Sequence, residues 1–378
     1  MIFLFKSAVM VLQWGARAAC TRRVLIPDQL EIFFIMMYNK YMTRLIFIFL
    51  DGVGIGKCID TNPFFIAKSA FLPFYTANNN ELHLPDGTRI KTIDATLGVD
   101  GLPQSATGQT SLFTGVNIPA LLNGHKGSYP DKSMRQIIKA KNLISHLRNQ
   151  NINARFINAY PFYGQLFSQQ HVDIHDDGSF HFSEAFPPIF KKRISVTTCM
   201  NIANQLIPFT EIDIIHETAL YQDYSNLSLI HMLEEAQASG KLKSLLKQVV
   251  LPLGIPTLPL FSPEKAAEIL FNASRKFDFM LYEYFQTDIY GHRHTFAERV
   301  QLIRQLDRLI GRLISLLDKK QDTLLITSDH GNLEDGTTLA HTRNPVPLVV
   351  WGNGSSEIRE NINSLIDVTP TIERFFEF

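Results

Sequence analysis

The run Leu45-Ile-Phe-Ile-Phe-Leu50 is apolar at every position and ends at Asp51-Gly52. A strand that is apolar on both faces is typical of a parallel sheet covered by helices on both sides. It predicts a strand at 44–50, and further short apolar, β-branched or aromatic runs predict strands at 153–158, 277–285, 323–327 and 346–351. Because helical segments stand between these strands, we predict the α/β class, with a mostly parallel sheet sandwiched by helices.

Helix signals stand on both sides of the middle of the chain. Residues 300–317 repeat apolar side chains at three- and four-residue steps, as an amphipathic helix requires. Ser262-Pro263 and Thr369-Pro370 each place a capping hydroxyl directly before a proline, which predicts two helix starts. Residues 133–148 are predicted to form one further helix.

The middle of the chain has a different pattern. Apolar and polar residues alternate strictly on both sides of Asp177-Gly178, which predicts a β-hairpin over 171–182 with a type I′ turn. Helices are expected at 196–207, 226–238 and 241–249. We interpret 161–262 as an inserted α+β cap or substrate region, between the two parts of a metal-binding core at 42–160 and 263–378.

Residues 1–41 show neither helical nor strand periodicity, so we expect them to be poorly ordered and outside the fold. A signal peptide that ends near Ala18-Ala-Cys20 is the alternative. Its apolar part, between Lys6 and Arg17, is too short to span a bilayer. We favour translation that starts at Met42, a cytoplasmic location and no stable membrane insertion.

Composition excludes several classes of protein. The chain has 378 residues, of which 45% are hydrophobic and 19% charged, as in ordinary folded proteins. Lys+Arg and Asp+Glu both total 36, and no basic stretch is longer than Lys191-Lys-Arg193, so we expect no nucleic-acid partner. Three widely spaced cysteines favour a reducing compartment without a disulfide framework. The sequence does not indicate an oligomeric state.

Three aspartates lie just beyond predicted strands, namely Asp51, Asp288 and Asp329. In open α/β sheets ligands bind at the carboxyl ends of the strands, so we expect these three to converge. His292, His330 and His341 lie close to them in sequence. Carboxylate with neutral imidazole suits Mn²⁺ or Zn²⁺. Two ions about 4 Å apart can hold both the attacking and the leaving oxygen of a displacement.

Ser105 is the candidate nucleophile. It precedes a plausible helix, where its hydroxyl would lie near backbone N–H groups that favour a phosphate. A bare serine is a weak nucleophile, and metal coordination would activate it without a general base. Each residue also has an ordinary interpretation: Ser105 as a helix cap, and Asp51-Gly52 and Asp329-His330 as turns. Those interpretations do not explain why these residues recur together behind apolar strands.

Four segments resemble the metalloenzyme branch of the alkaline phosphatase superfamily, which includes cofactor-independent phosphoglycerate mutase and phosphopentomutase. The segments are 47–56, Asp288-Ile-Tyr-Gly-His292, Ile326-Thr-Ser-Asp-His-Gly-Asn332 and Ala340-His-Thr-Arg-Asn-Pro-Val-Pro347. The resemblance implies an alkaline-phosphatase-like fold and two divalent ions, Mn²⁺ or Zn²⁺, with Mg²⁺ as an alternative. It also implies one ion at Asp51, Ser105, Asp329 and His330, and the other at Asp288, His292 and His341.

The chain departs from the mutase pattern around its serine. The mutase has Asn-Ser-Glu-Val-Gly-His, whereas this chain has Gln104-Ser-Ala-Thr-Gly-Gln109, and Thr110–Gly115 is more similar to phosphodiesterase and phosphatase relatives. The arginine-rich phosphate-binding motifs of the mutase are missing from 161–262. Candidate substrate-binding cations are Arg155, Lys191, Lys192, Arg193 and Arg343.

These features predict a two-metal phosphomutase or phosphatase that acts on a small phosphorylated metabolite through a phosphoserine at Ser105. The metal ligands do not separate the two activities, because the first half-reaction is common to both. A phosphodiester or phosphonate hydrolase is the alternative, followed by a non-catalytic metal-binding relative. We expect specificity to reside in the insertion.

Overall fold

The computed structural model describes residues 44–76, 81–161, 164–188, 190–239 and 258–377. The chain divides into two compact units, residues 1–42 and 43–378, and all described residues belong to the second. The predictions for residues 1–41 and for a helix at 241–249 lie outside the described residues.

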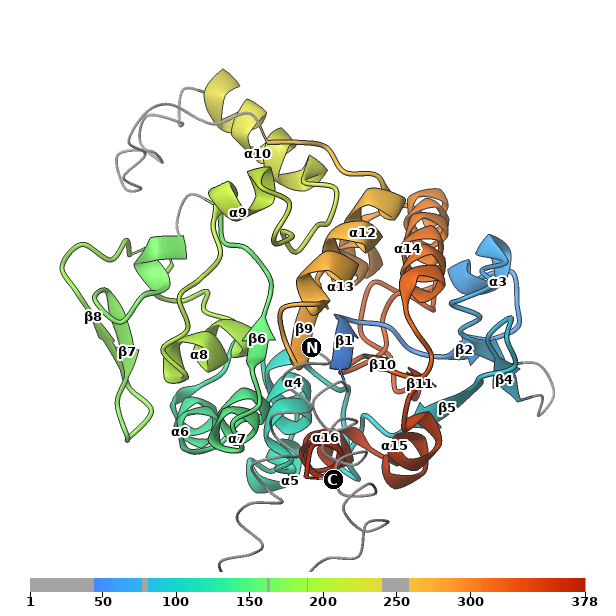
Figure 1. The fold of residues 1–378 in the computed structure, drawn as a ribbon, viewed down its shortest axis with the longest axis horizontal. Coiled ribbons are helices and arrows are strands. Elements are labelled where there is room, and N and C mark those ends of the chain that lie inside the picture. The colour runs from blue at the N-terminus through green and yellow to red at the C-terminus, as the bar shows by residue number, and fades with distance from the viewer. Residues whose placement is uncertain (1–43, 77–80, 162–163, 189, 240–257, 378) are drawn as a thin grey trace, which may run out of the picture. The chain divides into compact units, whose positions relative to one another are not determined.

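A seven-stranded sheet forms the centre of this unit (Figure 1). Its order is β4 (Leu82–His83), β5 (Arg89–Ile93), β11 (Val346–Gly352), β10 (Asp322–Thr327), β1 (Arg44–Leu50), β9 (Phe279–Tyr284) and β6 (Ala154–Phe156). β10, β1, β9 and β6 are parallel neighbours, while β11 is antiparallel to both β10 and β5. β5 therefore runs in the direction of β10, and only β11 and β4 are reversed. The predicted mostly parallel α/β sheet is confirmed.

Helices cover both faces of the sheet (Figure 1). Side chains of β1 point alternately to the two faces: Ile46 and Ile48 join the apolar cluster of α12 (Pro263–Ser274) and α14 (Phe296–Leu316). Phe47 and Phe49 join the cluster of α4 (Ser105–Thr114) and α16 (Val368–Phe375). Each apolar side chain of β1 is at most 1% exposed. Burial of one such side chain contributes about 1.5–3 kcal/mol to the stability of the fold, so the burial of all of them favours a central position for β1.

The helices predicted within the described residues are present with shifted ends, and the one predicted at 196–207 ends at Ala203. α12 begins at Pro263, and Ser262 Oγ accepts from the backbone N–H of Lys265, as predicted. α14 begins at Phe296, earlier than its apolar stripe, because Thr295 and Glu298 form a capping box. The stretch 133–148 is two helices, α6 (Lys132–Ala140) and α7 (Leu143–Asn149), because Asn142 caps the second.

The start predicted for the last helix is wrong by two residues. α16 begins at Val368, and Thr369 does not cap it. Thr369 Oγ1 instead donates to the carbonyl of Leu112 in α4. The smaller elements of the core are β2 (Gly56–Lys57), β3 (Tyr75–Thr76), α3 (Pro63–Ala67), α5 (Ile118–Leu121), α15 (Ser355–Asn361) and η2 (Leu365–Asp367).

The predicted hairpin in the middle of the chain is present as β7 (Val172–Ile174) and β8 (Phe180–Phe182). Its turn is not type I′, which needs positive φ at both central residues. Only Gly178 has positive φ, and its N–H donates to the carbonyl of His175 while the N–H of His175 donates to the carbonyl of Ser179. The loop therefore has three residues, 176–178, with glycine in the left-handed position.

The inserted segment lies on the β6 side of the sheet (Figure 1). Its other elements are η1 (Gly164–Phe167), α8 (Val196–Ala203), α9 (Glu211–Ile215) and α10 (Leu227–Ala238). Apolar residues of α8 belong to the same buried cluster as those of α4 and α7, and Leu229 of α10 belongs to the cluster of α12 and α14. The described part of the insertion thus packs directly onto the core, and the predicted domain boundaries stay a prediction.

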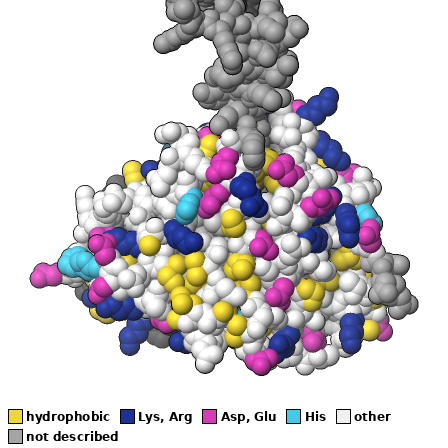
Figure 2. Space-filling model, turned by 90° about the horizontal axis from the view of Figure 1, so that it is seen from below, with side chains coloured by type: hydrophobic (Ala, Val, Ile, Leu, Met, Phe, Trp, Pro, Cys, Tyr) yellow, Lys and Arg dark blue, Asp and Glu magenta, His cyan; other side chains and the backbone are white. Residues whose placement is uncertain are grey.

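The surface is mixed in charge. Figure 2 shows lysine and arginine side chains interspersed with aspartate and glutamate over the face seen from below. In the part of the chain that the structure describes, no helix is both long enough and apolar enough to cross a membrane.

Candidate metal centre

The three predicted aspartates converge at the carboxyl ends of adjacent strands. Asp51 directly follows β1, and Asp329 lies two residues beyond β10. Asp288 lies in α13 (Gln286–Arg293), a helix after β9 that the sequence analysis did not predict. Asp288 and His292 are four residues apart in α13, so both point from one face of the helix.

Ser105 is the first residue of α4, a helix whose ten residues are all buried. Its Oγ lies 3.0 Å from Nε2 of His330. One turn later Gln109 donates from Nε2 to Oδ2 of Asp51, at 3.2 Å. No role is predicted for Gln109 from the sequence, although its i+4 spacing from Ser105 places both residues on one helix face.

The ligand candidates form two groups. Asp51, Asp329 and His330 offer ligand atoms within 4.8 Å of one another, and so do Asp288, His292 and His341. In the first group His330 Nε2 lies 3.5 Å from Asp51 Oδ1 and 3.4 Å from Asp329 Oδ2. This grouping is the one that the family resemblance implies.

The second group is closely spaced as well. His292 Nε2 lies 3.3 Å from Asp288 Oδ1, and His341 Nε2 lies 3.6 Å from the same oxygen. The two Nε2 atoms are themselves 3.0 Å apart. His292 Nδ1 lies 2.6 Å from the carbonyl of Leu339, and His341 Nδ1 lies 2.7 Å from that of Pro103.

These contacts fit two cations. A carbonyl only accepts, so in the neutral form of both rings we assign the proton to Nδ1, which leaves two Nε2 lone pairs facing each other. Metal-binding histidines commonly donate their other N–H to a carbonyl in this way. In the first group Asp51 Oδ1 and Asp329 Oδ2 are buried without a hydrogen-bond partner. A cation in each group would satisfy these atoms.

Burial makes the carboxylates costly in their charged form. Burial, and then the charge of Asp329, raises the pKa of Asp51 well above its usual range. Burial and the charge of Asp288 raise the pKa of Asp329 to about 7. Burial would also raise the pKa of Asp288, but the hydrogen bond from His292 and the charge of His330, both in their protonated forms, outweigh it and lower that pKa to about 2. The aspartates thus repel one another unless positive charge is present.

The histidines next to Ser105 are held neutral. Burial lowers the pKa of His330, and burial followed by the charge of His330 lowers the pKa of His341 to about 4. The hydrogen bond to Asp288 raises the pKa of His292. Neutral imidazole is the form that binds metals, so His330 and His341 are prepared as ligands at neutral pH.

Glu334 connects three of the ligand-bearing loops. Its Oε2 accepts from the backbone N–H groups of Gly54 and Asn332, both at 2.8 Å. Its Oε1 accepts from Asn344 Nδ2 at 2.9 Å and from the hydroxyl of Thr342. Glu334 is 2% exposed and was missed by the sequence analysis. One buried carboxylate thus joins the loops of Asp51, Asp329 and His341.

A cavity of about 540 Å³ opens beside the two groups. Ser105, Asp288, His292 and His341 line it, together with residues of the inserted segment. Among the five predicted cations only Arg193 lines this cavity, and Arg293, which was not predicted, lines it too.

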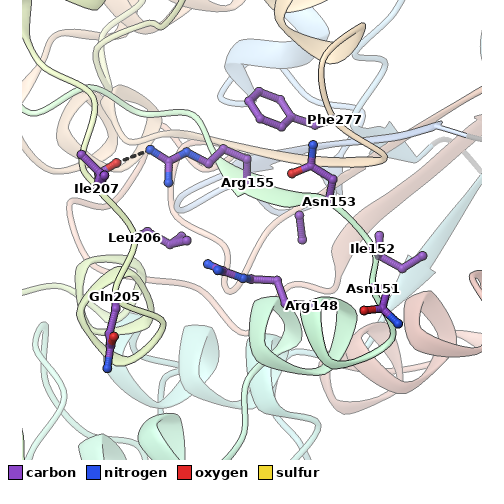
Figure 3. A pocket seen from close by; sticks show the side chains of 10 residues that line it. Arg148, Asn151, Ile152, Asn153, Arg155, Gln205, Leu206, Ile207 and Phe277 are labelled. Atoms are coloured by element: carbon purple, nitrogen blue, oxygen red, sulfur yellow. Dashed lines mark hydrogen bonds between the residues drawn. The ribbon is translucent and has the colours of Figure 1, made fainter.

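The other predicted cations do not line this cavity. Arg155 lines a different pocket with Arg148, and its guanidinium donates to the carbonyl of Ile207 (Figure 3). Lys191 lies over the ring of Phe182, with Nζ 5.0 Å from the ring centroid. Lys192 is exposed, and the guanidinium of Arg343 lies 3.7 Å from Asp100.

The chain belongs to the Metalloenzyme superfamily, which matches residues 43–378. This confirms the predicted family resemblance. Among curated relatives, 2,3-bisphosphoglycerate-independent phosphoglycerate mutase 2 of Methanosarcina barkeri (strain Fusaro / DSM 804) is 36% identical over 106 residues, which cover 26% of this chain and 20% of the mutase. The mutase of Gloeothece citriformis (strain PCC 7424) is 33% identical over 130 residues, 30% of this chain and 24% of the mutase. The matches thus span about a quarter or less of these relatives.

Two solved structures are also similar. Alkaline phosphatase from the Antarctic bacterium TAB5 has 12% identity and a TM-score of 0.46, over 88% of this chain and 98% of that chain. Leishmania mexicana phosphoglycerate mutase has 11% identity and a TM-score of 0.41, over 89% of this chain and 96% of that chain. At these identities and TM-scores the likeness supports no conclusion about function.

Proposed function

We propose that this protein is a two-metal phosphoryl-transfer enzyme that acts on a small phosphomonoester through a phosphoserine at Ser105. The observation that carries the proposal is the position of Ser105. The hydroxyl of Ser105 contacts His330 of the first ligand group. His341 of the second group is hydrogen-bonded to the carbonyl of Pro103, two residues before Ser105. The serine therefore lies at the junction of both groups and on the cavity wall.

The roles of the residues follow from this arrangement. Asp51, Ser105, Asp329 and His330 would hold one divalent ion, and Asp288, His292 and His341 the other. Such ions, Mn²⁺ or Zn²⁺ with Mg²⁺ as the alternative, supply charge neutralisation and Lewis-acid activation for phosphoryl transfer. Without an ion, His330 Nε2 accepts the hydrogen bond of Ser105, and the same lone pair would bind the ion; Gln109 orients Asp51.

The first half-reaction is an exchange of one ester for another. Ser105 Oγ forms a bond to phosphorus and loses its proton, and the bond from phosphorus to the substrate oxygen breaks. The substrate leaves as an alcohol, which gains a proton. A phosphatase then transfers the phosphoryl group to water, and a mutase returns it to another hydroxyl of the substrate. Arg193 and Arg293 lie on the cavity wall where they would attract the phosphate.

Turnover assays test this proposal. The purified protein, loaded in turn with Mn²⁺, Zn²⁺, Mg²⁺ and Co²⁺, is expected to release phosphate from p-nitrophenyl phosphate or to isomerise a sugar phosphate. Ser105→Ala should abolish turnover, because nothing replaces the nucleophile, and should retain most of the bound metal. Full activity in Ser105→Ala, or no turnover with any of these metals, contradicts the proposal.

The diesterase alternative depended on the likeness of Thr110–Gly115. In the structure Thr110 and Ser111 are fully buried in α4, and their hydroxyls donate to the carbonyls of Ala106 and Thr107. They line no part of the cavity, so this likeness concerns the packing of α4 rather than a substrate. Faster turnover of bis-p-nitrophenyl phosphate than of the monoester would favour the alternative. Metal binding without any turnover would favour a non-catalytic relative.

A further inference from the structure

Glu283 is a buried acid on the wall of the cavity that contains Ser105. It lies in β9, is 6% exposed, and is the single charged residue in the strand Phe279-Met-Leu-Tyr-Glu-Tyr284. The side chain of Asn158 fixes its backbone from both sides. Asn158 Oδ1 accepts from the N–H of Glu283 at 2.8 Å, and Asn158 Nδ2 donates to its carbonyl at 2.7 Å. These two contacts fix the backbone of Glu283, and with it the direction in which the side chain leaves β9.

The two carboxylate oxygens of Glu283 differ in their surroundings. Oε2 accepts from the hydroxyl of Thr197 at 2.8 Å, and Thr197 lies in α8 of the inserted segment. Oε1 accepts no hydrogen bond from any residue that the structure describes, and no cation among those residues forms an ion pair with Glu283. A buried carboxylate normally has all its oxygens satisfied, so Oε1 is available to a molecule that enters the cavity.

The charge of Glu283 restricts what that molecule can be. A carboxylate only accepts hydrogen bonds, so a hydroxyl group of a substrate is a suitable partner. A second anionic group is unsuitable beside Oε1, because two negative charges in contact at a buried, poorly solvated position repel each other.

We propose that Glu283 contacts the substrate and determines specificity, by accepting a hydrogen bond from a hydroxyl of the alcohol part of a phosphomonoester. The proposal rests on the proposed function. It assigns the substrate to the phosphate esters of polyhydroxy alcohols and excludes esters that have a second anionic group. Aromatic side chains of Phe156 and Phe285 on the same wall suit the carbon atoms of such an alcohol.

A matched pair of esters tests this assignment. Glycerol 3-phosphate and 3-phosphoglycerate differ only in a terminal CH₂OH or carboxylate. We expect wild type to prefer glycerol 3-phosphate by at least about tenfold in kcat/KM, because a site built for a hydroxyl rejects a like charge. Glu283→Gln keeps the shape, removes the charge and should bring the ratio close to one. Burial raises the pKa of Glu283 to about 7, so the assays belong at pH 8.

Controls separate specificity from folding and from catalysis. Glu234→Gln changes an exposed glutamate of α10 and should leave the ratio unchanged. Turnover of p-nitrophenyl phosphate by Glu234→Gln should equal that of wild type, which shows that exchange of a glutamate for a glutamine does not by itself change activity. If Glu283→Gln does not fold, Glu283→Asp keeps the charge and should lower turnover of glycerol 3-phosphate while still rejecting 3-phosphoglycerate.

The two proposals fail in different ways. If p-nitrophenyl phosphate is hydrolysed, a wild-type ratio near one, or an equal loss for both esters in Glu283→Gln, overturns the role of Glu283. If no ester is turned over with any metal, the proposed function fails. In that case calorimetry measures the dissociation constants of the two esters for the metal-loaded protein. Equal constants overturn the role of Glu283.

Discussion

His292 and His341 face each other with their Nε2 atoms 3.0 Å apart, while the Nδ1 atom of each ring is bonded to a backbone carbonyl. Two unprotonated nitrogens at this distance repel each other unless a positive charge lies near both. His341→Ala should therefore remove the second ion, and the metal content measured by mass spectrometry should fall from two ions to one. Activity should fall by more than the roughly 10–100-fold that loss of an outer-shell partner of a metal site costs.

A neighbouring histidine serves as the control for that substitution. His294 stacks on Tyr290, with ring centroids 3.8 Å apart, and belongs to neither ligand group. His294→Ala should keep two ions per chain. Loss of an ion in His294→Ala, or full metal content in His341→Ala, would contradict the assignment of the second site.

Asp329 should make the metal-free protein sensitive to pH. Its pKa rises from 3.8 to about 7 on folding, so the folded state binds more protons than the unfolded state between these values. Stability must then fall as pH rises from about 4 to 7. The pKa of His341 is lowered from 6.5 to about 4, so its contribution makes stability rise with pH between these two values. Asp329→Asn isolates the contribution of Asp329.

Melting temperatures across pH measure this effect. After chelation, Asp329→Asn should melt higher than wild type at pH 8 and close to it at pH 4.5. With metal present the order at pH 8 should reverse, because the bound ions stabilise wild type by mass action. Equal pH profiles of the melting temperature for the two metal-free proteins would show that folding does not raise the pKa of Asp329.

Glu334 should matter for both folding and metal binding. Glu334→Ala removes the acceptor of two backbone N–H groups and two side chains, and each unsatisfied buried donor costs about 1–3 kcal/mol. We expect a loss of at least about 3 kcal/mol in urea unfolding and weaker binding of both ions. Glu357→Ala, at an exposed position of α15, should change neither quantity. A loss of stability with unchanged metal affinity would limit Glu334 to a purely structural role.

Gly52 is required by its backbone angle and by its neighbour. Its φ is +69°, and an added Cβ would lie 2.6 Å from Asp288 Oδ1. Gly52→Ala should lower stability by more than the roughly 1–2 kcal/mol of a left-handed alanine and should displace Asp288, so that metal content falls. Gly87→Ala shares the positive φ, at +84°, but its Cβ would meet no atom within 4 Å. Gly87→Ala should lower the stability and leave the metal content unchanged.

Much of the site could be predicted because it follows from a rule about sheets. Asp51 directly follows the apolar run 45–50, Asp329 lies two residues beyond β10, and adjacent parallel strands bring their carboxyl ends together. The direction of β11 could not be read in this way. The apolar run 346–351 fits either direction, and the loop between Asp329 and Pro345 decides it.

The residues that the sequence did not reveal share a different property. Glu283 and Glu334 are single buried acids, and their roles depend on partners far away in sequence, such as Asn158 and Gly54. No local pattern in the sequence predicts such contacts. Arg155 lies in β6, and its guanidinium contacts Ile207 in a pocket other than the one that Ser105 lines.

The central claim is that Ser105 becomes phosphorylated during turnover. The metal-loaded protein should be mixed with a phosphomonoester, quenched in acid within one turnover, and digested for peptide mass spectrometry. We predict a phosphate on Ser105 in wild type, and none on the corresponding peptide of Ser105→Ala. Product formation with no phosphate on any peptide, or with phosphate on a different residue, would contradict the account.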